Sequence, residues 1–287
     1  MPTATVLDPP AFKSAARAQW DRAAAGWNEH GPQIRAWLRD ATAAMIDMAG
    51  VKRGSQVLDV AAGAGDQTCD LAERVGADGY VMATDISAGI LELAKRNIEQ
   101  AGCRNVEFRV ADGENLAVAA SRFDAAVCRL GLMLFPDPLR GLREMHRALR
   151  PGGSACTIVF STPQANPCIA VLMQTALEHA GLPPRDPYQP GSLMSLGKPG
   201  LIDELFRRAG FQAVATTRIS APFRLPSAAD YLDFIRSSAS PIQQILGGLD
   251  PTAQQSAFAE MQEKLRAFDV AEGWSGPNEL LLTAGQR

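Results

Sequence analysis

The stretch Val57-Leu58-Asp59-Val60-Ala61-Ala62-Gly63-Ala64-Gly65-Asp66 decides the fold of this chain. An apolar run ends in an acid, a loop of Gly and Ala follows, and a polar residue closes the stretch. This order predicts a strand, a tight turn and the N-terminus of a helix. Gly63 and Gly65 can adopt a positive φ and let a ligand approach the backbone, while the helix end offers unpaired N–H groups. The stretch therefore indicates a loop that binds a nucleotide-like cofactor.

Strands and helices alternate on both sides of this loop. We expect strands at 56–60, 79–85, 106–111, 123–129, 154–160, 212–219 and 278–283. Helices are expected between them at 67–75, 87–101, 138–149 and 201–209. Ser87 is expected to cap the second of these helices, and 151–153 (Pro-Gly-Gly) is expected to form a turn. Such alternation favours a parallel sheet that is covered by helices on both faces.

The remaining segments look like covers over the active edge of this sheet. Two helices are predicted before the loop, at 12–34 and 34–49, with Trp20, Ala24 and Trp27 recurring on one face. We interpret Trp37 as a packing residue. Residues 161–200 are rich in proline around a short helix at 169–180, and further helices are predicted at 227–237, 241–246 and 251–268. The predicted division is a helical lid at 1–50, a cofactor-binding core at 51–160, substrate-covering inserts at 161–200 and 221–275, and remaining core elements at 201–220 and 276–287.

The composition narrows the class of protein. The chain has 287 residues and a formal charge of -3, so no basic surface for nucleic acid is expected. Its five cysteines show no metal-ligand spacing, which favours a reducing compartment and no metal site. No signal peptide and no membrane span are expected, and a cytoplasmic protein is the default. The oligomeric state is left open, with a homodimer as one option.

The residues after the glycines indicate which cofactor the loop binds. The dinucleotide fingerprint places a third glycine where this chain has Thr68. Asp66 would put a negative charge where a pyrophosphate sits, which disfavours NAD and a dehydrogenase. S-adenosylmethionine has no phosphate and carries an ammonium and a sulfonium, so it suits the loop better.

Two further acids stand at the ends of the next two predicted strands, Asp85 as the last residue of 79–85 and Asp112 directly after 106–111. Asp85 could accept hydrogen bonds from both hydroxyls of a ribose, and Ile86 could pack on adenine. Asp112 could accept a hydrogen bond from the adenine amino group, and Asp59 could assist the amino-acid end of the cofactor through water or backbone. Because open α/β sheets bind ligands at the carboxyl ends of their strands, these acids are expected to share one site.

The segments VLDVAAGAGDQT, ATDIS, VADGENL, FDAAVCRLGLMLFPDP and ALRPGG resemble the class I S-adenosylmethionine-dependent methyltransferases. They are most similar to the ubiquinone/menaquinone biosynthesis C-methyltransferases and related small-molecule enzymes. The resemblance implies a Rossmann-like three-layer α/β sandwich with a seven-stranded, mostly parallel sheet whose last strand is antiparallel. It also implies cofactor contacts at the loop and at the strand ends. The full set that we predict to bind the cofactor is Trp27, Asp59, Ala61, Gly63, Gly65, Gln67, Asp85, Ile86, Asp112, Gly113, Glu114, Cys128, Arg129 and Leu130. Where the quinone enzymes usually carry Tyr-Asp, this chain has Trp27-Asn28, which keeps an aromatic ring over the cofactor.

Methyl transfer from a sulfonium is an in-line displacement, in which positioning contributes most of the rate. A base is needed only when the acceptor carries a proton. Of the three histidines, His146 and His179 have structural explanations, and His30 in the lid is our candidate base. Arg129 is expected to pair with a lid acid or to face an anionic acceptor.

Met133 and Phe135 are predicted, with Arg129, to contact the substrate and favour an apolar acceptor. The sequence thus predicts a methyltransferase that acts on a small, largely apolar aromatic, quinone-like or natural-product acceptor and releases S-adenosylhomocysteine. O-methylation is favoured. C- or N-methylation and an inactive, regulatory S-adenosylmethionine-binding protein are the alternatives.

Overall fold

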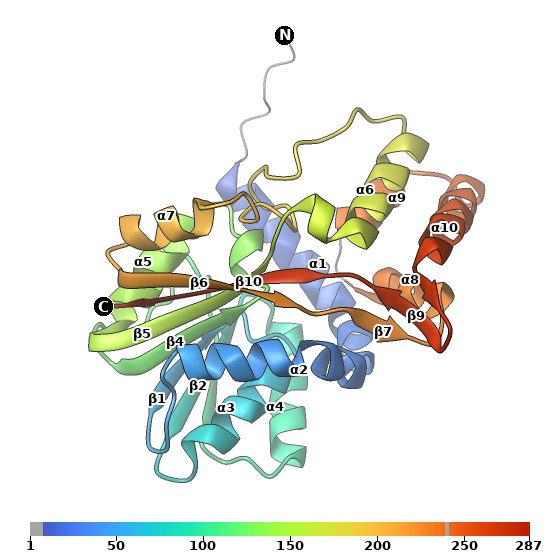
Figure 1. Cartoon of the computed structure of the whole chain (residues 1–287). Helices are drawn as coiled ribbons and strands as arrows, with labels where there is room; N and C mark the ends of the chain where they lie inside the picture. Colours follow the sequence, from blue (N-terminus) through green and yellow to red (C-terminus); the bar gives the residue numbers. More distant parts are fainter. Residues whose placement is uncertain (1–7, 239–240) are drawn as a thin grey trace.

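The computed structural model describes residues 8–238 and 241–287. A seven-stranded sheet in the order β3-β2-β1-β4-β5-β10-β6 forms its centre (Figure 1). Its strands are β1 (Gln56–Val60), β2 (Tyr80–Asp85), β3 (Val106–Val110), β4 (Phe123–Arg129), β5 (Leu149–Phe160), β6 (Gln212–Ser220) and β10 (Glu279–Gln286). The first five strands pair in parallel, and β10 runs antiparallel to both of its neighbours. The predicted three-layer α/β fold with an antiparallel last strand is confirmed.

Helices cover both faces of the sheet, as Figure 1 shows. One face carries α2 (Gly31–Met48), α3 (Asp66–Val75) and α4 (Ala88–Gln100), and the other carries α5 (Pro138–Ala148) and α7 (Leu201–Arg208). The central strands are therefore buried on both sides, which explains the continuous apolar runs of β1 and β4. The predicted Ser87 cap is confirmed, because its hydroxyl accepts a hydrogen bond from the backbone N–H of Ile90.

The segments that we predict to be inserts contribute a second layer beside the carboxyl end of the sheet. They contain α6 (Pro167–His179), α8 (Ala228–Ser237), α9 (Pro241–Leu246) and α10 (Pro251–Leu265), which lie together in Figure 1. A small sheet in the order β7-β9-β8 joins them through β7 (Phe223–Leu225), β8 (Asp269–Val270) and β9 (Gly273–Gly276). These three strands were not expected, because each spans four residues or fewer and shows too little alternation to be recognised.

The fifth strand begins earlier in the structure than the sequence predicts. The turn predicted at 151–153 lies inside β5, which begins at Leu149 and continues through Gly152 at a φ of 81°. The register against β4 shifts there, between Phe123 and Ala125, so glycine permits an irregular strand instead of ending it.

Helix α1 (Pro9–Glu29) crosses from the inserts to the cofactor-binding half and packs on α4 and α8. We call this helix the lid helix. Residues 1–7 and 239–240, which the predicted division assigns to the lid and to the second insert, lie outside the described residues.

Within the described ranges, no helix is both long and apolar enough to cross a membrane. The same residues contain no cluster of His, Cys, Asp or Glu that could hold a metal ion.

Candidate active site

One large cavity lies at the carboxyl ends of β1, β2, β3 and β4, between the sheet, the lid helix and the inserts. The strand order reverses between β1 and β4, which is where open α/β sheets bind ligands. Most of the predicted cofactor and substrate residues line it. They are Trp27, Ala61, Gly63, Gln67, Asp85, Ile86, Asp112, Gly113, Glu114, Arg129, Leu130, Met133 and Phe135.

The glycine loop is bound to the second strand by Asp85. Gly63 and Gly65 have φ values of 58° and 88°, as the sequence predicts for this turn. The backbone N–H groups of Gly63 and Ser87 donate to the two oxygens of Asp85, each at 3.0 Å. Burial raises the pKa of the Asp85 carboxyl above its usual value, while these hydrogen bonds oppose the shift. Each oxygen keeps a free lone pair for a ligand hydroxyl.

Asp59 supports the loop from behind. It is fully buried and does not line the cavity. Its carboxyl accepts hydrogen bonds from Gln67 Nε2 at 3.2 Å and from Thr68 Oγ1 at 2.6 Å. Burial raises the pKa of Asp59 to about 7, although both hydrogen bonds lower it. Asp59 therefore holds the first turn of α3 rather than facing the cavity. Gly65 and Cys128, also predicted as cofactor contacts, lie behind the lining as well.

Arg129, at the end of β4, lies across the cavity floor. Its guanidinium donates to Asp66 and, at 2.9 Å, to the Thr42 hydroxyl of α2. The side chain of Arg129 is only 4% exposed. The negative charge of Asp66, which the loop sequence leaves without a partner, is therefore paired with the Arg129 guanidinium. Arg129 is distant from Asp66 in the sequence but close to it in the fold. Arg129 pairs with an acid of the cofactor loop, and not with an acid of the lid.

Two residues of the cavity wall have an unusual backbone. Ala61 and Leu130 follow β1 and β4 and have φ values of 57° and 58°. Side chains other than glycine rarely adopt this left-handed conformation, and such strain gathers at functional sites. The space is also tight, because a Cβ on Gly131 would lie 2.5 Å from Ala61 Cβ. The chain thus turns sharply after both strands, and the two turns lie close together beside the cavity.

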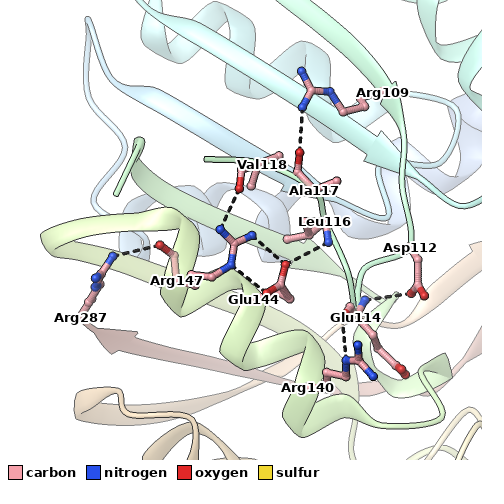
Figure 2. A network of polar contacts seen from close by, with 10 residues as sticks. All are labelled: Arg109, Asp112, Glu114, Leu116, Ala117, Val118, Arg140, Glu144, Arg147 and Arg287. Atoms are coloured by element: carbon pink, nitrogen blue, oxygen red, sulfur yellow. Dashed lines mark hydrogen bonds and ion pairs between the residues drawn. The ribbon is translucent and has the colours of Figure 1, made fainter. Parts of the chain in front are cut away.

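The loop after β3 carries Asp112 and is held by α5 (Figure 2). Arg140 Nε donates to the Glu114 carbonyl at 3.0 Å, and the Leu116 N–H donates to Glu144 at 3.0 Å. The Glu114 N–H donates in turn to Asp112 Oδ1 at 2.9 Å. Gly113 is required here, because a Cβ would lie 2.2 Å from the Phe135 ring. The network therefore fixes the loop that carries Asp112, and Gly113 allows this loop to pack closely on Phe135.

The lid helix covers this half of the cavity. Lys13 Nζ binds Asp112 at 2.8 Å and Glu114 at 2.5 Å. Trp27 packs on Trp20, with ring centroids 5.4 Å apart, and on the Phe234 ring of α8 at 5.8 Å. The helix thus joins the cofactor half to the inserts.

The other half of the cavity is largely apolar, with five aromatic side chains among ten lining residues, and we call it the acceptor end. Its lining residues are Trp37, Phe160, Ile169, Leu193, Phe223, Tyr231, Phe234, Ile235, Ser238 and Asn278. Trp37 stacks on Phe223 with centroids 4.8 Å apart and donates to the Ala221 carbonyl at 2.7 Å. Trp37 packs as the sequence analysis assumed, and it also lines the cavity.

His30 lies next to the acceptor end. Its ring contacts the edge of Phe234 at a centroid distance of 5.4 Å, and it is not among the lining residues. Its role as a base stays a prediction. His146 packs on Phe211 and His179 binds Glu260, in agreement with their structural interpretation.

Several lining residues were not singled out from the sequence as site residues. Lys13 lies in a helix without a motif, and Phe160 and Phe223 sit in strands whose aromatic residues suit any core. The one feature of the sequence that could have pointed to these lining residues is the number of aromatic residues in the predicted inserts. This number indicates an apolar pocket but does not show which rings contact one another.

Comparisons with known proteins agree with this geometry. The model of the ubiE/COQ5 methyltransferase family matches residues 33–178, about half of the chain. The ubiquinone/menaquinone biosynthesis C-methyltransferase UbiE of Klebsiella pneumoniae is 38% identical over 123 residues, which are 42% of this chain and 49% of that relative. The match thus spans about half the length of such curated relatives.

A longer match exists with the 2-phytyl-1,4-naphtoquinone methyltransferase of Nostoc punctiforme. It is 36% identical over 195 residues, which are 64% of this chain and 81% of that protein. The solved structure of YcgJ from Bacillus subtilis has the same fold, with a TM-score of 0.59, 17% identity, and coverage of 87% of this chain and 98% of that one. S-adenosylmethionine, and not NAD, is the cofactor that the family match supports. With its fold, its glycine loop and its strand-end acids in place, the chain belongs to the ubiE/COQ5 methyltransferase family.

Proposed function

We propose that this protein transfers a methyl group from S-adenosylmethionine to a small, largely apolar aromatic acceptor. The observation that carries the proposal is one cavity with two unlike halves. Strand-end acids and the glycine loop line one half, and stacked aromatic side chains line the other. A cofactor and an apolar acceptor bound in these halves would meet at the wall formed by Leu130 and Met133. The predicted inserts at 161–200 and 221–275 would then cover the acceptor.

The residues of the cofactor half fit this cofactor. Asp85 has a lone pair free on each oxygen and would accept hydrogen bonds from the ribose hydroxyls. Ile86 lies beside it in the lining and would pack on the adenine ring. Asp112 would accept a hydrogen bond from the adenine amino group once Lys13 yields one of its contacts. When bound, the cofactor supplies a methyl group that its sulfonium has already activated.

The acceptor end favours an acceptor that ionises readily by itself. Among its described residues there is no Asp, Glu, His, Lys or Arg. A phenol or a hydroquinone loses its proton far more readily than an alcohol, so it depends less on a base. His30, beside Phe234, would assist only if its ring turned towards the cavity.

Carbon is the favoured receiving atom within this class. The relative from Klebsiella is named a C-methyltransferase, and the one from Nostoc is named for a naphthoquinone. A hydroquinone anion carries negative charge on its ring carbons as well as on oxygen, so it can react at either. O-methylation, which the sequence analysis favours, becomes the alternative outcome. The homodimer and the cytoplasmic location stay predictions of the sequence.

A transfer assay tests this proposal. The protein is incubated with S-adenosylmethionine carrying a ¹³C-labelled methyl group and with 1,4-naphthohydroquinone or 1-naphthol. We expect a labelled product from the hydroquinone, with the label on ring carbon by NMR. A label on the acceptor oxygen would show that the protein is an O-methyltransferase and not a C-methyltransferase. Tight binding of S-adenosylhomocysteine without transfer to any aromatic acceptor would contradict the proposal and favour a regulatory cofactor-binding protein.

A further inference from the structure

The acceptor end contains three polar side chains among its apolar ones. They are those of Tyr231, Ser238 and Asn278. The Ser238 hydroxyl donates to the Ile235 carbonyl at 3.1 Å, and Asn278 Nδ2 donates to the Gly276 carbonyl at 3.3 Å. Asn278 Oδ1 has no hydrogen-bond partner within residues 8–238 and 241–287, and the same holds for the Tyr231 hydroxyl. Of these two oxygen atoms, only the Tyr231 hydroxyl can donate a hydrogen bond.

The ring of Tyr231 is held firmly in place. It stacks on Trp274 with centroids 4.7 Å apart and an interplanar angle of 22°. It also meets Phe223 edge-on, at 5.8 Å and 86°. Trp274 is anchored in turn, because its Nε1 donates to the Leu265 carbonyl at 2.9 Å. The ring is therefore fixed by α8 and by the small β7-β9-β8 sheet, so the hydroxyl has a defined position.

The Tyr231 hydroxyl has no partner in the protein and is not fully enclosed, since Thr157 Oγ1 and Asn278 Oδ1 are the fully buried atoms without a partner among the described residues. Tyr231 is only 4% exposed, and buried tyrosine hydroxyls are normally hydrogen-bonded. An accessible hydroxyl without a protein partner can bind a ligand in the cavity that Tyr231 lines. Phenylalanine at this position would preserve both ring contacts. The hydroxyl thus has no structural task that these contacts explain, while the residue lines the cavity.

We propose that the Tyr231 hydroxyl donates a hydrogen bond to an oxygen substituent of the aromatic acceptor and positions its ring for methyl transfer. The acceptor class is then narrower than an apolar aromatic: a flat ring that carries a hydroxyl or carbonyl oxygen. This inference rests on the proposed function. Burial raises the pKa of the Tyr231 hydroxyl above its usual value, so it remains a neutral donor and not a base. Tyr231 is thus a positioning residue.

Two matched ligands and two matched variants test this role. The ligands are 2-naphthol and naphthalene, which share the ring system and differ in one oxygen. The variants are Tyr231→Phe and, as a control, Tyr188→Phe, which lies outside the cavity lining. Affinities are measured by equilibrium dialysis with the full chain in the presence of S-adenosylhomocysteine. We expect wild type and Tyr188→Phe to prefer 2-naphthol, and Tyr231→Phe to lose about tenfold in affinity for 2-naphthol only.

The ratio of the affinities for 2-naphthol and naphthalene distinguishes a lost hydrogen bond to the ligand oxygen from a general disturbance of the pocket. A disturbed pocket would weaken both ligands alike, and such a parallel loss in Tyr231→Phe would overturn the proposal. Unchanged affinity for 2-naphthol in this variant would overturn it too, as would a wild type that binds neither ligand or does not prefer 2-naphthol. Methyl transfer is not needed for this measurement. A protein that shows the naphthol preference but transfers no methyl group would contradict the proposed function and leave the Tyr231 contact standing.

Discussion

Lys13 Nζ lies 2.8 Å from Asp112 Oδ2 and 2.5 Å from Glu114 Oε2, and so joins the first turns of the lid helix to the loop after β3. Burial lowers the pKa of Lys13, but the hydrogen bonds and charges of the two carboxylates outweigh this and raise it above its usual value. Lys13 therefore stays charged and closes the lid helix over the carboxylate that we assign to adenine.

Replacing Lys13 by Met should loosen the lid helix. The ion pair is mostly shielded from solvent, and its loss should lower the free energy of local opening by about 1 kcal/mol. Amide hydrogens of α1 should then exchange about fivefold faster, measured by mass spectrometry on peptides from 9–29. Arg17→Met, on an exposed part of the same helix, is the control. Equal exchange in both variants would show that Lys13 does not hold the helix.

Replacing Arg129 by Met should destabilise the whole protein. Asp66 would remain beside the cavity without its cation, and breaking such a shielded pair costs about 3 kcal/mol. The midpoint of urea denaturation measures the change. Arg150→Met is the matched control, because it breaks an ion pair with Asp124 whose side chains are 44% and 38% exposed, which costs about 1 kcal/mol or less. Similar losses in the two variants would contradict the importance of the Arg129 pair.

Replacing Asp85 by Asn should weaken cofactor binding. The Asn amide group would replace one of the two oxygens that accept from the backbone N–H groups of Gly63 and Ser87 by an N–H₂ donor. The charge-assisted hydrogen bonds to the ribose hydroxyls would also be lost. We expect the affinity for S-adenosylhomocysteine to fall by about tenfold or more by calorimetry. Asp78→Asn, at an exposed turn, should bind normally. Circular dichroism checks that the first variant is folded, and undiminished binding by that folded variant would refute the assignment.

Asp59 should make stability depend on pH. Its pKa is raised from 3.8 to about 7, so between these values the folded protein holds a proton that the unfolded chain has lost. The contribution is fully present below about pH 4, and the free energy of unfolding falls as pH rises towards 7.

Asp59→Asn cannot ionise, so the difference in stability between pH 5 and pH 8 should shrink by about 2 kcal/mol. Urea denaturation at both pH values measures it, with Asp78→Asn as the control for a general change in charge. A variant that keeps the full pH dependence of the wild type would show that another group causes it.

Local features of this protein were predictable from short segments. The glycine loop, the acids at the ends of β1 and β2 and the Ser87 cap each depend on residues within a few positions of one another. The alternation of strands and helices likewise predicted a parallel sheet covered on both faces, because each strand that is buried on both sides has its own apolar run. The seven strands and the antiparallel β10 were implied by the resemblance to the class I methyltransferases. Such patterns survive without knowledge of the rest of the chain.

The short strands β7, β8 and β9 were not predictable, because their stability comes from neighbours rather than from their own residues. The pairing of Asp66 with Arg129 was not predicted either. An ion pair between residues 63 positions apart depends on how α3 and β4 pack together, and no local sequence pattern predicts this packing.

The sequence by itself determined the fold, the cofactor loop and the class of cofactor, because these follow from periodicity and from turn and charge chemistry at short range. Only the tertiary structure decided which side chains meet across the cavity: Lys13 with Asp112, and the unpartnered Tyr231 hydroxyl with the acceptor end. These contacts arise where segments distant in sequence pack together. The physical reason is that specificity for the acceptor depends on the relative placement of helices and strands, which each segment encodes only in combination with the others.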